Sequence, residues 1–149
     1  MENYTLKSYS PKDHQFVYDT KKDLYQKYVK ANWGEWNEEK QQKFFKKFIK
    51  TYEKDIMIIM LNDEKIGFYH GNNIDDENYE ICNVCIVENH QNKGIGTSII
   101  KSLINAHKHQ NIHLQYFKQN PVVKLYEKLG FEKTEQTTTH IKMILKKQA

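Results

Sequence analysis

The chain has 149 residues and a formal net charge of +4, because its 23 basic residues only slightly outnumber its 19 acidic ones. Aromatic residues make up 13% of the chain, which argues against disorder, and the length fits one folded domain over residues 1–149. The mild positive charge suits a polyanionic small molecule and argues against a dense nucleic-acid-binding face.

The N-terminal residues contain no apolar stretch after a basic start, so the sequence predicts no secretory signal. The longest apolar run, Ile56 to Leu61, falls far short of the roughly 20 residues that a membrane helix needs. We therefore expect a cytoplasmic protein with neither a membrane nor a nucleic acid as its partner.

In the first half of the chain, an alternating strand over Tyr4–Tyr9 is followed by a helix that opens at Pro11 and presents apolar residues at helical spacing. Asn37 is a good N-cap for a second amphipathic helix that continues to Tyr52. A buried strand is expected next over Ile56–Leu61, followed by a turn over Asn62–Lys65. A second strand over Ile66–Gly71 and a polar loop over Asn72–Asn78 complete this half.

In the second half, a strand over Tyr79–Val87 leads through a loop, Glu88–Gly96, into a third helix. Asn120 and Pro121 are expected at the N-cap and first position of a fourth helix, which Gly130 ends. The remaining expected elements are the third helix over Thr97–His109 and strands over Ile112–Phe117, Phe131–Thr139 and Ile141–Leu145. This order predicts one mixed α/β domain.

Neither the cysteines nor the histidines suggest a metal site. Cys82 and Cys85 have C-x-x-C spacing, but three positions apart on a strand they point to opposite faces, so we interpret them as small apolar residues. His107, His109 and His113 lie across a helix end and a strand start, which gives them no common face. We expect no metal.

Two glycines stand where the strand over Tyr79–Val87 turns into the third helix, in the segment Gln91-Asn92-Lys93-Gly94-Ile95-Gly96. Glycine permits positive φ and a close approach of the backbone to a ligand. The first N–H groups of a helix have no partner within it and face the positive end of its dipole, so they favour an anion such as a pyrophosphate. Lys93 adds a positive charge. A tight turn without a ligand is the alternative interpretation of this loop.

A second segment carries a motif of its own, Asn120-Pro121-Val122-Val123-Lys124-Leu125-Tyr126-Glu127-Lys128-Leu129-Gly130-Phe131. Taken together, the two segments resemble the GNAT superfamily of N-acetyltransferases. The first is similar to that family's Q/R-x-x-G-x-G/A pyrophosphate loop and the second to its N-P-x-x-x-L-Y-E-K-L-G-F segment. Two departures are Asn92, where the loop often has Gly, and Glu88, where the family often has Pro.

The resemblance implies the family's fold, a mixed and mostly antiparallel central sheet of about seven strands, splayed at a bulge and flanked by four helices. It also implies that acetyl-CoA is the co-substrate, with its pantetheine arm against the backbone of Cys85, Ile86 and Val87. By the same resemblance, the pyrophosphate would be held by Gln91, Asn92, Lys93, Gly94, Ile95, Gly96 and Thr97, and Asn120 would contact the arm.

The resemblance implies two catalytic roles in a direct acetyl transfer without an acyl-enzyme. Tyr126 matches the family tyrosine that protonates the leaving thiolate and also contacts the cofactor. Glu80 matches a position where some members carry a glutamate base, which would act through water. A water chain without Glu80 is the alternative.

For the acceptor, the resemblance implies a pocket walled by the first two helices and the loop between them. The candidate substrate-binding residues are Tyr28, Trp33, Trp36 and His70, with capping of the core as the alternative role of the aromatic residues. A small-molecule primary amine is the expected acceptor. The alternatives are a protein lysine or N-terminus, and a non-catalytic acyl-CoA-binding sensor on the same fold. The family often dimerises, so a homodimer is compatible with the resemblance.

Overall fold

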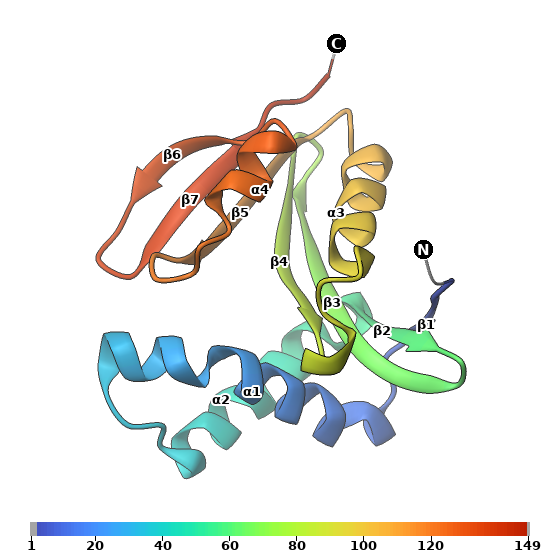
Figure 1. The fold of residues 1–149 in the computed structure, drawn as a ribbon, viewed down its shortest axis with the longest axis vertical. Coiled ribbons are helices and arrows are strands. Elements are labelled where there is room, and N and C mark those ends of the chain that lie inside the picture. Colours follow the sequence, from blue (N-terminus) through green and yellow to red (C-terminus); the bar gives the residue numbers. More distant parts are fainter. Residues whose placement is uncertain (1–2, 149) are drawn as a thin grey trace. The chain divides into compact units, whose positions relative to one another are not determined.

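The computed structural model describes residues 3–148, which form two compact units. Unit 1 contains the chain up to His70 together with Asn83–Gly96, and unit 2 contains Gly71–Cys82 together with the chain from Thr97 onward. Seven strands are hydrogen-bonded in the order β1-β2-β3-β4-β5-β7-β6 (Figure 1). All pairings given below are antiparallel except that of β4 with β5. The mixed α/β fold with a seven-stranded, mostly antiparallel sheet and four α-helices confirms the sequence-based expectation.

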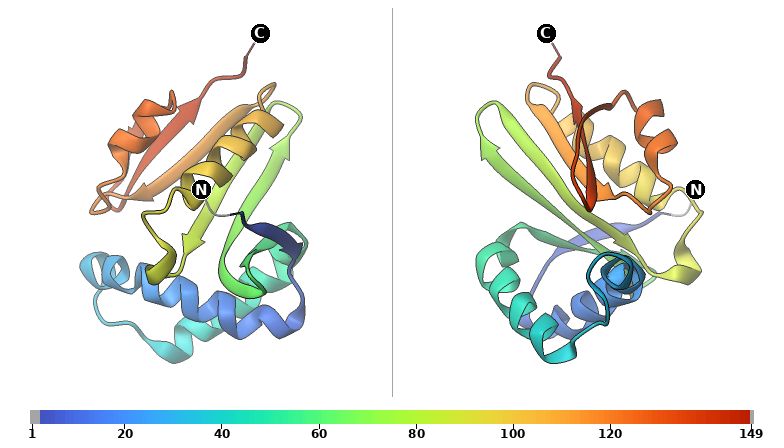
Figure 2. Two further views of the ribbon diagram at one scale, coloured as in Figure 1. Left: turned by 45° about the vertical axis from the view of Figure 1, so that its right-hand side comes forward. Right: turned by 90° about the vertical axis from the view of Figure 1, so that its left-hand side faces the viewer.

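Unit 1 is built on two long helices, α1 (His14–Trp33) and α2 (Glu38–Tyr52). The helices lie side by side (Figure 2), and the rings of Tyr18 and Phe45 meet edge to face at 5.2 Å. The predicted cap of α2 is confirmed, because the Asn37 side chain accepts a hydrogen bond from the Lys40 amide at 2.9 Å. One cluster of buried side chains in this unit consists of Val17, Tyr18, Phe45, Ile49, Ile56, Ile58, Phe68 and Cys85.

The strands of unit 1 are β1 (Thr5–Ser8), β2 (Ile56–Leu61) and the first part of β3 (Glu64–Asp75), joined by the last part of β4 (Asn78–Ile86). Asn62 and Asp63 both have positive φ, as the two central residues of a type I′ hairpin turn require. The expected turn is therefore present but shorter than predicted. Short 3-10 turns cover Pro11–Asp13, Glu53–Asp55 and Glu88–His90.

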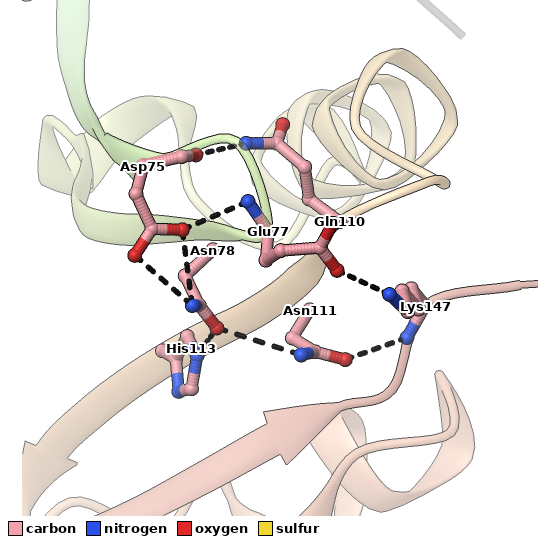
Figure 3. Close-up of polar contacts among 7 residues, drawn as sticks. All are labelled: Asp75, Glu77, Asn78, Gln110, Asn111, His113 and Lys147. Carbon is pink, nitrogen blue, oxygen red and sulfur yellow. Dashed lines mark hydrogen bonds and ion pairs between the residues drawn. The ribbon is translucent and has the colours of Figure 1, made fainter.

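The prediction of a polar loop over Asn72–Asn78 is wrong, because β3 continues to Asp75 and β4 begins at Asn78. A network of side chains within unit 2 stabilises this polar hairpin (Figure 3). Asp75 accepts hydrogen bonds from the Glu77 amide at 2.8 Å and from the Asn78 amide group at 3.1 Å. The Asn78 side-chain oxygen in turn lies 2.8 Å from Nε2 of His113. These partners make a strand of a segment whose composition alone favours a loop.

Unit 2 also contains most of α3 (Ile95–Ala106), β5 (Asn111–Phe117), α4 (Val123–Lys128), β6 (Glu132–Gln136) and β7 (His140–Leu145). β5 pairs in parallel with β4, from Asn78 opposite Asn111 to Ile81 opposite Leu114. β7 pairs antiparallel with both β5 and β6. The third helix was expected to end at His109, but it ends three residues earlier. There the His107 ring stacks on Tyr79 at 3.5 Å.

The expected start of α4 was wrong. Its N-cap position is Val122, and no side chain caps the helix. Asn120 and Pro121 precede the helix in a turn in which the Asn120 amide donates to the Phe117 carbonyl at 2.8 Å, and the Val122 amide donates to the Asn120 carbonyl at 3.0 Å. The strand expected over Phe131–Thr139 is also shorter, because β6 ends at Gln136. Thr137 then accepts a hydrogen bond from the His140 amide and closes the turn into β7.

Candidate functional site

The segment after β4 in unit 1 has the backbone conformation that its glycines and Asn92 suggest. Asn92 has φ 63° and Gly94 has φ 82°, and α3 begins directly afterwards at Ile95. Asn92, Lys93 and Gly94 are all exposed. A Cβ built on Gly94 would meet no atom within 4 Å, so the glycine is required there for its positive φ rather than for space. The loop therefore exposes Asn92, Lys93 and Gly94 directly before the start of α3.

Gln91 attaches this loop to the end of β4. Its side-chain amide donates to the Ile86 carbonyl at 2.8 Å, and its backbone amide donates to the Glu88 carbonyl at 3.1 Å. The first residue of the motif thus acts through the protein backbone and holds the turn in shape. Both hydrogen bonds fix the start of the loop over residues 91–96.

The backbone groups at the end of β4 have different partners. The Val87 amide donates to the Ile66 carbonyl of β3 at 2.9 Å, and the Val87 carbonyl accepts from the His90 amide at 3.0 Å. Successive residues of a strand direct their amides to opposite sides, so the Ile86 amide points away from β3. Among the three residues expected to contact the pantetheine arm, Ile86 is therefore the best placed to donate to a ligand.

Cys85 is fully buried and participates in packing. Burial raises the pKa of its thiol to about 11, although the Tyr25 hydroxyl and Lys21 oppose part of this shift. Its sulfur lies 3.5 Å from the Tyr25 hydroxyl, which also accepts a hydrogen bond from Asn83 at 3.0 Å. A thiol with this pKa stays protonated near neutral pH and is a poor nucleophile. Both cysteines are free.

His70, one of the candidate substrate-binding residues, is only 2% exposed. Its ring lies against Phe48 at 5.2 Å and Tyr52 at 4.7 Å. Neither ring nitrogen makes a hydrogen bond of good geometry among the described residues. Burial lowers the pKa of His70, and Lys21 adds to this effect, whereas Asn83 and Asp55 oppose it. The histidine is therefore neutral near pH 7.

The other candidate substrate-binding residues lie in different environments. Tyr28 is buried, with 8% of its surface exposed, whereas Trp33 is 62% exposed at the end of α1. Trp36 packs against the core of unit 1 and donates from Nε1 to Glu38 at 2.9 Å. Trp33 is thus the aromatic residue of this set that is open to solvent.

Glu38 is held by several donors and carries a compensated charge. It accepts hydrogen bonds from Lys22 at 2.8 Å and from the Tyr18 hydroxyl at 2.7 Å, besides those from Trp36 and Gln42. The hydrogen bond from Lys22 is the largest of the effects that lower the pKa of Glu38 to about 2. Because Tyr18 and Lys22 belong to α1, this carboxylate links α1 to the start of α2.

In unit 2, Tyr126 lies on the last turn of α4 and is partly exposed. Its ring contacts Tyr116 of β5 at 5.7 Å and Phe131 at 5.9 Å. The Phe131 amide donates to the Tyr126 carbonyl at 3.0 Å, and Gly130 between them has φ 101°. The predicted glycine stop is thus confirmed, and it turns the chain so that Phe131 packs on Tyr126.

Glu80 lies on β4 of unit 2, opposite His113 of β5, and is partly buried. Thr97 follows Gly96 in the first turn of α3 and is also partly buried. Tyr116, which no sequence motif marks, is buried beside Tyr126. The alternation of β5 was the available signal, because it places Tyr116 on the same face as Ile112 and Leu114.

Within residues 3–148, His, Cys, Asp and Glu side chains form no group of three that could hold a metal ion. No helix in this part of the chain combines the length and apolar character needed to span a membrane.

Residues 18–131 match the family model of the acetyltransferase (GNAT) family. A search of curated proteins found no match. Solved structures with a similar fold include the PaiA N-acetyltransferase of Thermoplasma acidophilum in complex with coenzyme A (TM-score 0.71, 16% identity, 98% of this chain and 99% of that one). Another is the ribosomal-protein-S18-alanine N-acetyltransferase of Escherichia coli (TM-score 0.70, 18% identity, 99% of this chain and 96% of that one).

Proposed function

The chain belongs to the GNAT family of acetyltransferases, and we propose that it transfers the acetyl group of acetyl-CoA to a primary amine by direct attack. The family performs acetyl transfer that depends on acetyl-CoA. We further propose that the acceptor is a primary amine and that the residues named below act on it. We also propose that both units work as one acetyltransferase domain. The observation that carries them is the conformation of the loop over residues 91–96, with positive φ at Asn92 and Gly94 directly before α3.

This loop holds the pyrophosphate of acetyl-CoA in our proposal. Backbone amides from Asn92 to Thr97 donate to the phosphate oxygens, and the helix dipole of α3 favours the negative charge. Lys93, which is exposed, contributes a cation. The Ile86 amide, pointing away from β3, donates to the thioester carbonyl as an oxyanion-type donor. Cys85 and Val87 shape the backbone on both sides, and Asn120 contacts the pantetheine arm.

Two side chains move protons in the proposed reaction. Glu80 accepts a proton from the ammonium form of the acceptor through a water molecule, which leaves a neutral amine as the nucleophile. The amine nitrogen bonds to the acetyl carbon, the carbon–sulfur bond breaks, and the nitrogen releases its surplus proton to water to give the neutral amide. Tyr126 donates its phenol proton to the departing thiolate, which becomes the free thiol of coenzyme A, and then regains a proton from water. Tyrosine suits this role because its ordinary pKa is about 10.

The acceptor is a small-molecule amine in our proposal, and the solvent-exposed ring of Trp33 supplies its first contact. A cationic amine binds well to an indole face. His70, which is only 2% exposed, packs its neutral imidazole against Phe48 and Tyr52 and supports this wall from beneath. Tyr28 and Trp36, which are more deeply packed, support this wall from within.

The test is release of free thiol from acetyl-CoA in the presence of amines: polyamines, aminoglycosides, amino acids and lysine peptides. We expect turnover with one amine class and a fall in kcat of about 10²-fold in Tyr126→Phe, the size typical of general acid catalysis. Tyr69→Phe, on β3 and without a proposed role, is the matched control. Turnover with lysine peptides alone would contradict the small-molecule acceptor.

Binding of acetyl-CoA is measured separately by calorimetry. Binding without turnover on any amine would contradict the enzyme and favour an acyl-CoA sensor. Absence of binding would contradict the cofactor site itself. For the acceptor wall, we expect Trp33→Ala to raise KM for the amine while KM for acetyl-CoA stays unchanged.

A further inference from the structure

Tyr116 has a buried hydroxyl group without a hydrogen-bond partner in the described part of the chain. The residue lies on β5, opposite Ile141 of β7, and is 7% exposed. It shares its face of the strand with Ile112 and Leu114, which are also buried. Its neighbours on this face are apolar, so the hydroxyl interrupts an otherwise apolar surface.

A buried phenol normally finds a partner, because the group loses its hydrogen bonds to water on folding. A side chain without a hydroxyl would fill a core position of β5 without this cost. Burial raises the pKa of Tyr116, and the negative charge of Glu127 adds to the shift. The phenol therefore stays protonated at neutral pH and is available as a hydrogen-bond donor.

The position of Tyr116 relates it to the proposed reaction. Its ring lies 5.7 Å from the ring of Tyr126, with an angle of 34° between the two planes. Both residues belong to unit 2. The Tyr116 side chain therefore lies directly beside the residue to which we assign the proton transfer.

We propose that Tyr116 is a ligand-binding residue whose hydroxyl donates a hydrogen bond to a carbonyl group of the acetyl-pantetheine arm of acetyl-CoA. The carbonyl is that of the thioester or of the neighbouring pantetheine amide, which share the same acceptor chemistry. Tyr116 orients the arm, while Tyr126 delivers the proton to sulfur. This inference rests on the proposed function.

Tyr116→Phe tests the proposal because it removes only the oxygen atom. In the free protein we expect the melting temperature to stay the same or to rise, since an unpaired buried donor has been removed. Affinity for acetyl-CoA, measured by calorimetry, should fall about three- to tenfold, the range of one net hydrogen bond. Tyr69→Phe serves again as the control and should bind with unchanged affinity.

The same titrations with coenzyme A, which lacks the thioester, identify the accepting carbonyl. A loss seen only with acetyl-CoA assigns the bond to the thioester, and a loss seen with both ligands assigns it to the pantetheine amide. Both results support the proposal. Unchanged affinity of Tyr116→Phe together with a lower melting temperature would overturn it, because the hydroxyl would then be paired with a buried water molecule.

The failure of this inference is distinguishable from that of the proposed function. If the unaltered protein binds no acetyl-CoA, the proposed function fails, and the role of Tyr116 fails with it. If the unaltered protein and Tyr116→Phe bind acetyl-CoA equally well, only the role of Tyr116 is overturned.

Discussion

The buried carboxylate of Asp13 and the ammonium group of Lys65 lie 2.6 Å apart, and this ion pair joins the turn before α1 to strand β3. The Asp13 side chain has no exposed surface, whereas that of Lys65 is 31% exposed. Asp13 also accepts hydrogen bonds from the Ser10 amide at 2.9 Å and from Lys7 at 3.3 Å. The carboxylate is thus a shared acceptor for three segments of unit 1.

Replacing Asp13 with asparagine should destabilise the protein strongly. The amide keeps the shape of the side chain but removes the charge that the two lysines and the Ser10 amide contact. We expect the free energy of unfolding to fall by about 2 kcal/mol, as for other buried charge-assisted hydrogen bonds. Urea denaturation measures the change. Asp19→Asn, an exposed site on α1, is the matched control and should change stability far less.

The contribution of Asp13 should depend on pH in the acid range. Burial alone would raise the pKa of this carboxyl, but hydrogen bonds from Lys65, Ser10 and Lys7 outweigh it and lower the pKa to about 2. An unfolded aspartate has a pKa of about 3.9. The stabilisation is therefore fully present above about pH 4 and is lost as the pH falls through about 2. Unfolding curves of the original protein and Asp13→Asn should converge over this range, and a constant difference would contradict the assignment.

His70 should give the opposite pH dependence to a histidine that gains a charged partner. Its pKa is lowered by burial, so the folded state binds a proton less readily than the unfolded chain does. Stability from a neutral His70 is fully present above the unfolded pKa, about 6.5, and is lost as the pH falls from there through the folded pKa. Urea midpoints at pH 7.5 and 5.5 should show a larger fall in the original protein than in His70→Phe. His109→Phe, at an exposed position, should retain the original dependence.

The two glycines before and within the first turn of α3 should respond differently to alanine. Gly94 has φ 82°, where a Cβ is strained by about 1 kcal/mol or more. Gly96 has no such φ, and its nearest neighbours to an added Cβ are side-chain atoms at 3.9 Å. We expect Gly94→Ala to weaken acetyl-CoA binding about fivefold or more by reshaping the loop, and Gly96→Ala to weaken it less. Equal effects would mean that close approach of the ligand, rather than φ, sets the requirement for glycine.

Local signals in the sequence were sufficient for several features of the fold and the candidate site. Asn37 caps α2 because a side-chain oxygen needs only the amide three residues ahead. Gly130 ends the turn after α4, and Gly94 adopts a positive φ, because glycine makes these conformations accessible. The family motifs at residues 91–96 and 120–131 could also be recognised from the sequence, because each consists of consecutive residues.

Only the tertiary structure decided the features that depend on distant partners. The hairpin of β3 and β4 extends through a polar segment because the Asn78 side chain is hydrogen-bonded to His113 on β5, 35 positions away. Asp13 becomes a buried carboxylate because Lys65 arrives from β3. Tyr116 resembles an ordinary strand aromatic in the sequence, and its buried hydroxyl beside Tyr126 emerges only when β5 and α4 pack together. The burial of a side chain and its hydrogen-bond partners depend on which segments pack against each other in the fold. Local sequence patterns do not specify that packing.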